Sequence, residues 1–183
     1  MLKLILASCL ALFLFFGCEE SSTSPPEESS VFETLTFGSE YDDNGNAVTQ
    51  TPDGGYLLVG SSYSESTLSD LYTIKTDSKG SMTADSVYNL ITDSDVTSFE
   101  QASDVKVLPD GGYIVVGRKF NTATQNDVWL VKLNADLSVV FSKTFDSGSS
   151  DDDIGYSVNL CDDNGFIIAG TTYSSNGYDM WIL

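Results

Sequence analysis

The sequence predicts an all-β protein built from four-stranded units that recur along the chain. Hydrophobic residues make up 41% of the 183 residues and aromatic residues 11%. Together with many Gly, Ser, Thr and Asn residues, this composition is typical of short strands joined by tight turns. Two motifs also recur in register, which marks internal repetition. The first motif occupies residues 51–60, 108–117 and 162–170, and the second occupies residues 70–75, 127–132 and 179–183.

Each unit is interpreted as four strands in sequence. The second strand is a continuous apolar run, such as residues 56–59, and a continuous run indicates burial on both faces. The third strand carries the second motif, and the fourth is exemplified by residues 139–145. Four strands per unit, with the middle strands buried on both faces, is the pattern of a β-propeller blade stacked between neighbours. The expected first strands are residues 47–50, 103–107 and 156–160, and residues 85–90 are a further fourth strand.

A tight turn separates the first and second strands of each unit. Its Asp side chain caps the turn, and the next residue takes a left-handed conformation. In the third unit Asn stands at that left-handed position, and Asn tolerates positive φ better than most residues. The predicted turn residues are Asp53, Gly54, Gly55, Asp110, Gly111, Gly112, Asp163, Asn164 and Gly165.

The order of these motifs resembles that of bacterial cell-envelope proteins with β-propeller repeats. The pattern is a Gly-, Ser- and Asp-rich loop, then DGGY-apolar-G, then D-apolar-W-apolar-K, and residues 149–158 fit the loop part. The resemblance covers residues 31–183. It implies a propeller fold and an envelope location, and it carries no general activity, because propellers host unrelated functions.

The predicted fold is about two full blades plus one split or incomplete blade, with unit boundaries at residues 31–90, 91–145 and 146–183. Residues 31–37 resemble a fourth strand with no blade before it, and the chain stops inside a third strand at Leu183. The leading explanation is a fragment of a larger propeller. The alternative is assembly of two chains into a six-bladed ring, because exposed blade faces and edges favour self-association.

The amino terminus has the features of a lipoprotein signal peptide over residues 1–17. Lys3 precedes an apolar run of residues 4–16, which is too short to span a bilayer comfortably. Gly17 and Cys18 then resemble the bacterial lipobox, in which the cysteine becomes the acylated first residue of the mature chain. Phe15 departs from that pattern, which usually has Leu there, and cleavage by ordinary signal peptidase is the alternative. Polar residues 18–30 predict a flexible tether. The acidic residues directly after Cys18 resemble export signals of surface lipoproteins in some Gram-negative phyla, and this resemblance implies an anchor in the bacterial outer membrane and exposure at the cell surface.

Charge and composition exclude several functions. The net charge of −19 provides no basic surface for nucleic acid. The absence of His removes Ser-His-Asp and Cys-His catalysis. The sequence indicates no cofactor apart from a candidate calcium ion. Clustered carboxylates suit Ca²⁺, which makes the acidic loops candidates for a calcium site. The candidate ligands are Asp42, Asp43, Asp151, Asp152 and Asp153.

The expected function is a non-catalytic binding or structural module that contacts an unknown protein or glycan through its propeller loops. The alternative is a glycan-active hydrolase or lyase of the envelope whose site lies in missing blades. Equivalent aromatic residues in the third strands are interpreted as core packing rather than as a sugar-stacking platform. These residues are Tyr72, Trp129 and Trp181, while Lys75 and Lys132 are expected to pair with nearby acids and Cys161 to be a small buried residue.

The lipobox resemblance gives a first prediction. Replacing Cys18 with Ser should release the protein from membranes, because acyl-chain burial supplies about 0.8 kcal/mol of binding free energy per CH₂ group. Membrane fractionation measures the release, and mass spectrometry of the mature wild-type amino terminus identifies the modification. An unacylated terminus that begins at another residue would contradict this assignment.

Overall fold

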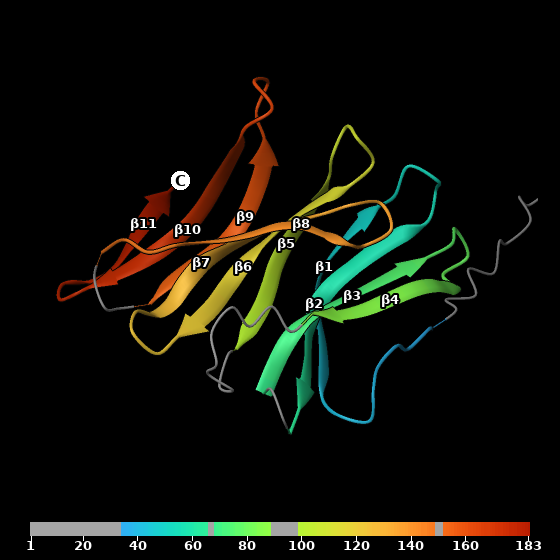
Figure 1. Ribbon diagram of the computed structural model, residues 1–183, viewed down its shortest axis with the longest axis horizontal. Helices are drawn as coiled ribbons and strands as arrows, with labels where there is room; N and C mark the ends of the chain where they lie inside the picture. Colours follow the sequence, from blue (N-terminus) through green and yellow to red (C-terminus); the bar gives the residue numbers. More distant parts are fainter. Residues whose placement is uncertain (1–33, 66–67, 89–98, 149–151) are drawn as a thin grey trace, which may run out of the picture. The chain divides into compact units, whose positions relative to one another are not determined.

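A computed structural model of the protein describes residues 34–65, 68–88, 99–148 and 152–183, and within them the chain forms three antiparallel sheets (Figure 1). The first sheet has the order β1-β2-β3-β4, the second β5-β6-β7-β8 and the third β11-β10-β9. The strands are β1 (Asp43–Gln50), β2 (Tyr56–Ser64), β3 (Leu68–Thr76), β4 (Met82–Tyr88), β5 (Glu100–Val107), β6 (Tyr113–Asn121), β7 (Gln125–Leu133), β8 (Val139–Phe145), β9 (Asp153–Leu160), β10 (Phe166–Ser174) and β11 (Gly177–Ile182).

The predicted all-β class is confirmed, because the described residues contain no helix. Consecutive strands of a sheet are hydrogen-bonded neighbours, so each sheet is a simple meander. Leu35–Leu183 form one compact unit. The described part of the chain contains no helical segment with the length and hydropathy needed to cross a membrane.

The first strand of each sheet begins earlier than the sequence analysis expected. β1 begins at Asp43, β5 at Glu100 and β9 at Asp153, so residues predicted to lie in loops belong to strands. A β-bulge lets each strand continue past an irregularity in pairing. In β5 the bulge lies opposite Gly117, where a Cβ atom would stand 1.9 Å from the Gln101 carbonyl oxygen. Corresponding register shifts occur in the pairings of β1 with β2 and of β9 with β10.

The turns between first and second strands have the backbone conformation that their residues predict. Gly54 and Gly111 have φ values of 85° and 82°, and Asn164 has 65°. In the second sheet the Gly112 amide donates to Asp110 Oδ1 at 2.9 Å, and the Leu108 amide donates to the Gly112 carbonyl at 2.8 Å. The turns are therefore determined by local chemistry.

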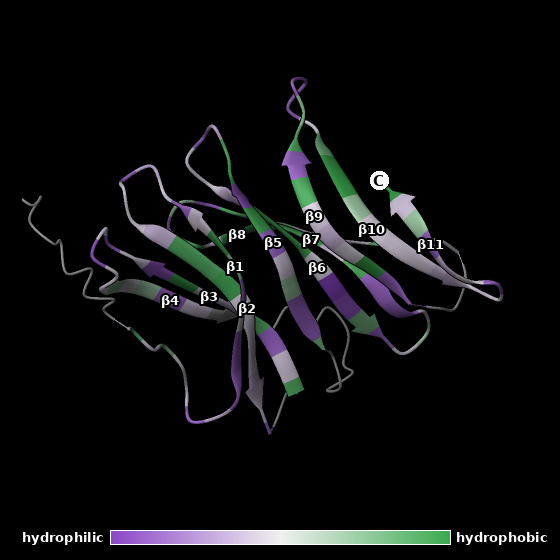
Figure 2. Cartoon of the chain, turned by 180° about the vertical axis from the view of Figure 1, so that it is seen from behind, coloured by the Kyte–Doolittle hydropathy of each residue, from purple (hydrophilic) through white to green (hydrophobic). Residues whose placement is uncertain are grey.

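The core consists of two apolar layers, one on each side of the second sheet. The first layer joins Leu57 and Leu71 of the first sheet to Trp129 of the second. The second layer joins Ile114 of the second sheet to Val158 and Ile168 of the third. Figure 2 shows apolar residues in green along the strands that form these layers. The sheets thus bury one another through their faces.

Polar contacts link the neighbouring first strands at both junctions. Asn46 Nδ2 in β1 donates to the Ala102 carbonyl in β5 at 2.7 Å. Asp104 in β5 accepts from the Val158 amide in β9 at 3.1 Å and from Ser157 Oγ at 3.0 Å. These bonds fix how each sheet is set against the next.

Burial on both faces, predicted for all three second strands, is found only in β6. Ile114 has 0% exposure and Tyr113 1%, whereas Tyr56 in β2 is 38% exposed and Ile167 in β10 is 45% exposed. The prediction is wrong for β2 and β10 because the first and third sheets each have a described sheet against one face only.

The fourth strand predicted at residues 31–37 is also wrong where the structure describes it. Residues 34–37 form no strand, and residues 31–33 lie outside the described part. Leu35 instead lies against the β3–β4 turn, where a Cβ atom on Gly80 would stand 2.4 Å from Leu35 Cδ1. Among the described strands β11 pairs with β10 alone, and the Leu183 amide donates to the Ile168 carbonyl at 3.1 Å.

The turn conformation yields a stability prediction. Gly111→Val should lower the free energy of unfolding by about 1–3 kcal/mol, because a β-branched residue resists positive φ. A Cβ atom on Gly111 would meet nothing within 4 Å, so the loss reports backbone strain rather than a clash. Urea denaturation measures it. Gly111→Asn is the matched control and should lose less, because Asn164 adopts this conformation in the third sheet.

Candidate functional site

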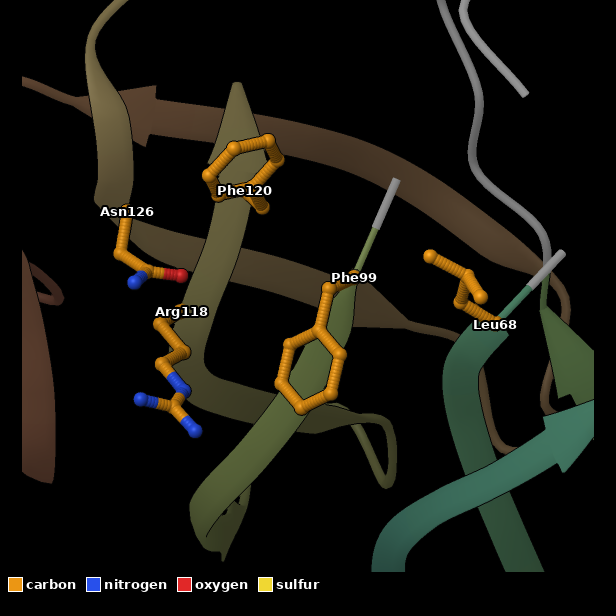
Figure 3. A pocket seen from close by; sticks show the side chains of 5 residues that line it. All are labelled: Leu68, Phe99, Arg118, Phe120 and Asn126. Carbon is orange, nitrogen blue, oxygen red and sulfur yellow. The ribbon is translucent and has the colours of Figure 1, made fainter. Parts of the chain in front are cut away.

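A pocket of about 400 Å³ lies where strands of the first and second sheets begin or end. Leu68 begins β3, Phe99 directly precedes β5, Arg118 and Phe120 belong to β6, and Asn126 belongs to β7. Figure 3 shows these five side chains around the pocket. Phe99 is held by a parallel bridge to Ser69, and its carbonyl accepts a hydrogen bond from the Phe120 amide at 2.8 Å. Backbone pairing therefore positions the aromatic walls.

The chemistry of the pocket comes from one cation set among apolar groups. The Arg118 guanidinium carbon lies 5.1 Å from the centroid of the Phe99 ring, which is cation–π distance. Arg118 Nε is buried and has no hydrogen-bond partner within the described residues. The Phe99 ring lies on one side of the guanidinium, whose planar fork of donors suits a carboxylate. A buried donor without a partner is energetically costly, and an acceptor supplied by a ligand would remove that cost.

The hairpin loops beside the pocket contain two residues with left-handed backbone. Leu68 and Gln125 both have φ of 67°, and each ends the loop that joins the second and third strands of its sheet. Gly177 occupies the corresponding place in the third sheet, with φ of 112°. A short hairpin loop that ends in a left-handed residue is an ordinary way to join two strands. Loop geometry therefore explains these conformations.

A buried ion pair supports the pocket from the opposite face of β6. Lys119 Nζ lies 3.0 Å from Glu100 Oε1, and the Glu100 residue has 0% exposure. Lys119 stands between Arg118 and Phe120 in sequence, while Glu100 follows Phe99. Removal of one partner from a buried pair is strongly destabilising, because a buried charge is left without compensation. The pair thereby holds the strand ends that carry the pocket residues.

Asp127, next to the pocket residue Asn126, has an elevated pKa. Burial of its carboxyl raises the pKa, and the negative charges of Asp146 and Asp153 raise it further. A hydrogen bond of 3.0 Å from Thr124 Oγ1 acts in the opposite direction. The charged form of Asp127 is therefore less favourable in the folded protein than in the unfolded chain.

Three of the candidate calcium ligands, Asp43, Asp152 and Asp153, accept hydrogen bonds from neighbouring residues. Asp43 and Asp153 are strand residues, and they accept hydrogen bonds from the amides of Ser39 and Ser147, respectively. Asp152 Oδ1 accepts from Asn126 Nδ2 at 2.7 Å, which ties the third sheet to the pocket wall. In residues 34–65, 68–88, 99–148 and 152–183 no group of three or more acidic or Cys residues could hold a metal ion. Asp42 directly precedes β1. Asp151 and Cys18 lie outside the described residues.

The repeated aromatic and lysine positions lie outside the pocket. Trp129 is fully buried and donates from Nε1 to Ser142 Oγ at 2.7 Å, so it is a core residue. Tyr72 is also buried, and Trp181 packs against the second apolar layer. Cys161, expected to be buried, is half-exposed.

The expected lysine pairs are confirmed. Lys75 Nζ lies 3.2 Å from Asp53, and Lys132 Nζ lies 2.8 Å from Asp110. Hydrogen bonds from Thr51 and Lys75 lower the pKa of Asp53 to about 2. These two lysines thus stabilise the turns through ion pairs, and neither lines the pocket.

Sequence reasoning missed the pocket. Its one readable signal is Arg118, a cation placed directly after the apolar run and Gly117 in a chain with only 8 basic residues. Comparison with protein-family models and with curated proteins finds no significant match to this chain.

The environment of Asp127 gives a prediction about pH. Its folded-state pKa is raised, so the residue favours folding when protonated, and that contribution is lost as pH rises through the folded pKa. Asp127→Asn should therefore raise the free energy of unfolding at pH 7, and the gain should vanish below the ordinary Asp pKa of 3.8. Urea denaturation at several pH values measures the difference, and Asp162→Asn, in an exposed turn, is the control. A loss of stability at pH 7 would contradict the prediction.

Proposed function

We propose that this chain is a lipid-anchored module of the bacterial cell envelope, with propeller-type blades, that binds a ligand rather than transforming one. Support for the envelope location comes from the amino-terminal sequence, and support for the blades comes from three stacked meander sheets in an all-β fold. The observation that carries a binding function is the pocket formed by Arg118, Phe99 and Phe120 at the strand ends.

The pocket favours a ligand that presents one carboxylate beside a nonpolar face. Arg118 offers planar donors for a carboxylate, and the rings of Phe99 and Phe120 offer apolar surface. A polyanion is disfavoured, because a chain with a net charge of −19 repels a run of negative charges. A single acidic group on a protein or glycan segment matches both constraints.

The residues lining the pocket favour binding over catalysis. They are two Phe, one Leu, one Asn and one Arg, and none of these is a residue type that commonly serves as a general acid, a general base or a nucleophile. A hydrolase or lyase needs a positioned acid, base or nucleophile at the reacting bond. The binding function rests on this composition.

A titration with paired probes tests the proposal. N-acetylphenylalanine is compared with its uncharged primary amide, and glucuronate with glucose, while NMR follows the Arg118 Nε–Hε signal. We expect at least one acid to move this signal and to bind about tenfold more tightly than its neutral partner, since a charge-assisted hydrogen bond contributes about 1.5–3 kcal/mol.

Two variants sharpen the test. Arg118→Gln should abolish the preference for the acid while the fold remains intact. Lys143→Gln should leave the preference unchanged, because Lys143 also lies over a ring, at 5.5 Å from the Phe141 centroid, but does not line the pocket. Equal binding of acid and neutral probes, or the same loss in both variants, would show that Arg118 does not select the ligand.

A further inference from the structure

The outer face of the third sheet exposes apolar side chains at positions that are buried in the second sheet. Met180 is 86% exposed and Ile182 64%, although the corresponding residues of the second sheet, Val128 and Leu130, are 0% and 5% exposed. Ile167 is 45% exposed, whereas its counterpart Ile114 is fully buried. We call this side of a sheet its trailing face. The trailing face of the second sheet packs against the third sheet.

The outer face of the first sheet shows the same contrast on the opposite side at its β1 and β2 positions, whereas Tyr72 and Ile74 of β3, on that same face, are 9% and 7% exposed. Val48 is 61% exposed, while its counterparts Val105 in β5 and Val158 in β9 are each 1% exposed. Tyr56 is 38% exposed, and its counterpart Tyr113 is 1% exposed. We call this side the leading face. In the second and third sheets it packs on the preceding sheet.

Both internal junctions therefore follow one rule, in which the trailing face of one sheet packs on the leading face of the next. The rule leaves one trailing face, on the third sheet, and one leading face, on the first, without a described sheet against them. These two faces are of complementary kinds. A contact between two third sheets would instead place like faces together, an arrangement that neither junction of the fold uses.

We propose that a second copy of this chain seats the leading face of its first sheet on the trailing face of the third sheet. The contact continues the established series of junctions, so its register can be taken from them. At the internal junction a Cβ atom on Gly155 would stand 2.7 Å from Val116 and 3.1 Å from Val128. By the pairing register Gly45 corresponds to Gly155.

The same register places Gly45 of the second copy against Ala169 and Met180, the counterparts of Val116 and Val128. A Cβ atom on Gly45 would meet nothing within 4 Å in the single chain, so this position has room for a neighbour. Because the two contacting surfaces differ, the assembly is head-to-tail. It either closes into a ring or continues as an open series.

Disulfide trapping in cells that express the full chain tests the register, in a background carrying Cys161→Ser. The Gly45→Cys/Met180→Cys variant should give a covalent dimer or a ladder on a non-reducing gel. Gly45→Cys/Val140→Cys is the matched control, because Val140 is 49% exposed on β8, outside both faces. It should stay monomeric. Met180→Cys alone traps a dimer only if like faces meet, and that result would overturn the head-to-tail assignment.

A second measurement does not depend on cysteine chemistry. Met180→Asp should reduce the mass of the purified protein in light scattering to that of a monomer, whereas Val140→Asp should leave the assembly intact. Because Met180 is largely exposed in the single chain, its replacement should leave the monomer folded by circular dichroism. A wild-type protein that is monomeric at all concentrations, with no trapped product from the paired cysteines, would overturn the proposal.

Discussion

The burial of the second sheet on both faces is the constraint on which the rest of the fold depends. Tyr113, Ile114, Val115 and Val116 form a continuous run in which exposure does not exceed 1%. Burial of apolar surface contributes about 25 cal/mol per Å², and β6 obtains that contribution only when a sheet lies against each side. An isolated sheet with this sequence would leave one apolar face in water. The sheets must therefore stack. Because stacking buries the middle of β6, its polar side chains lie towards the end of the strand.

The separation of each strand into a buried apolar part and a polar end explains where the pocket lies. Along β6 the buried apolar run ends at Gly117, and Arg118, Lys119 and Phe120 follow it. Alternation along the strand sends Lys119 to the buried Glu100 on one face and Arg118 to Phe99 on the other. Lys119 thus has a carboxylate partner and Arg118 an aromatic ring beside it. The same strand provides the core of the fold and the cation of the site.

Local and non-local features differed in how far they could be predicted. The turns were predictable because Gly111 and Asn164 owe their conformation to their own backbone preferences. The lysine–aspartate pairs were predictable because a motif of fixed spacing brings Lys132 to Asp110. The pocket was not, because the contact of Arg118 with Phe99 depends on strand pairing and on a neighbouring sheet. Similar apolar runs in β6 and β10 also gave no sign that only one has neighbours on both sides.

The faces that build the fold and the faces left at its two ends are of the same kind, and this links folding to association. Each chain carries a net charge of −19, so copies repel one another at long range. That repulsion is screened beyond about 8 Å at physiological salt, whereas apolar contact acts at short range. Charge can thus keep dilute chains apart without preventing the contact once faces meet. A lipid anchor would raise the local concentration of chains and favour association by mass action. The pocket belongs to the first and second sheets and takes no part in the proposed contact, so ligand binding and assembly can occur together.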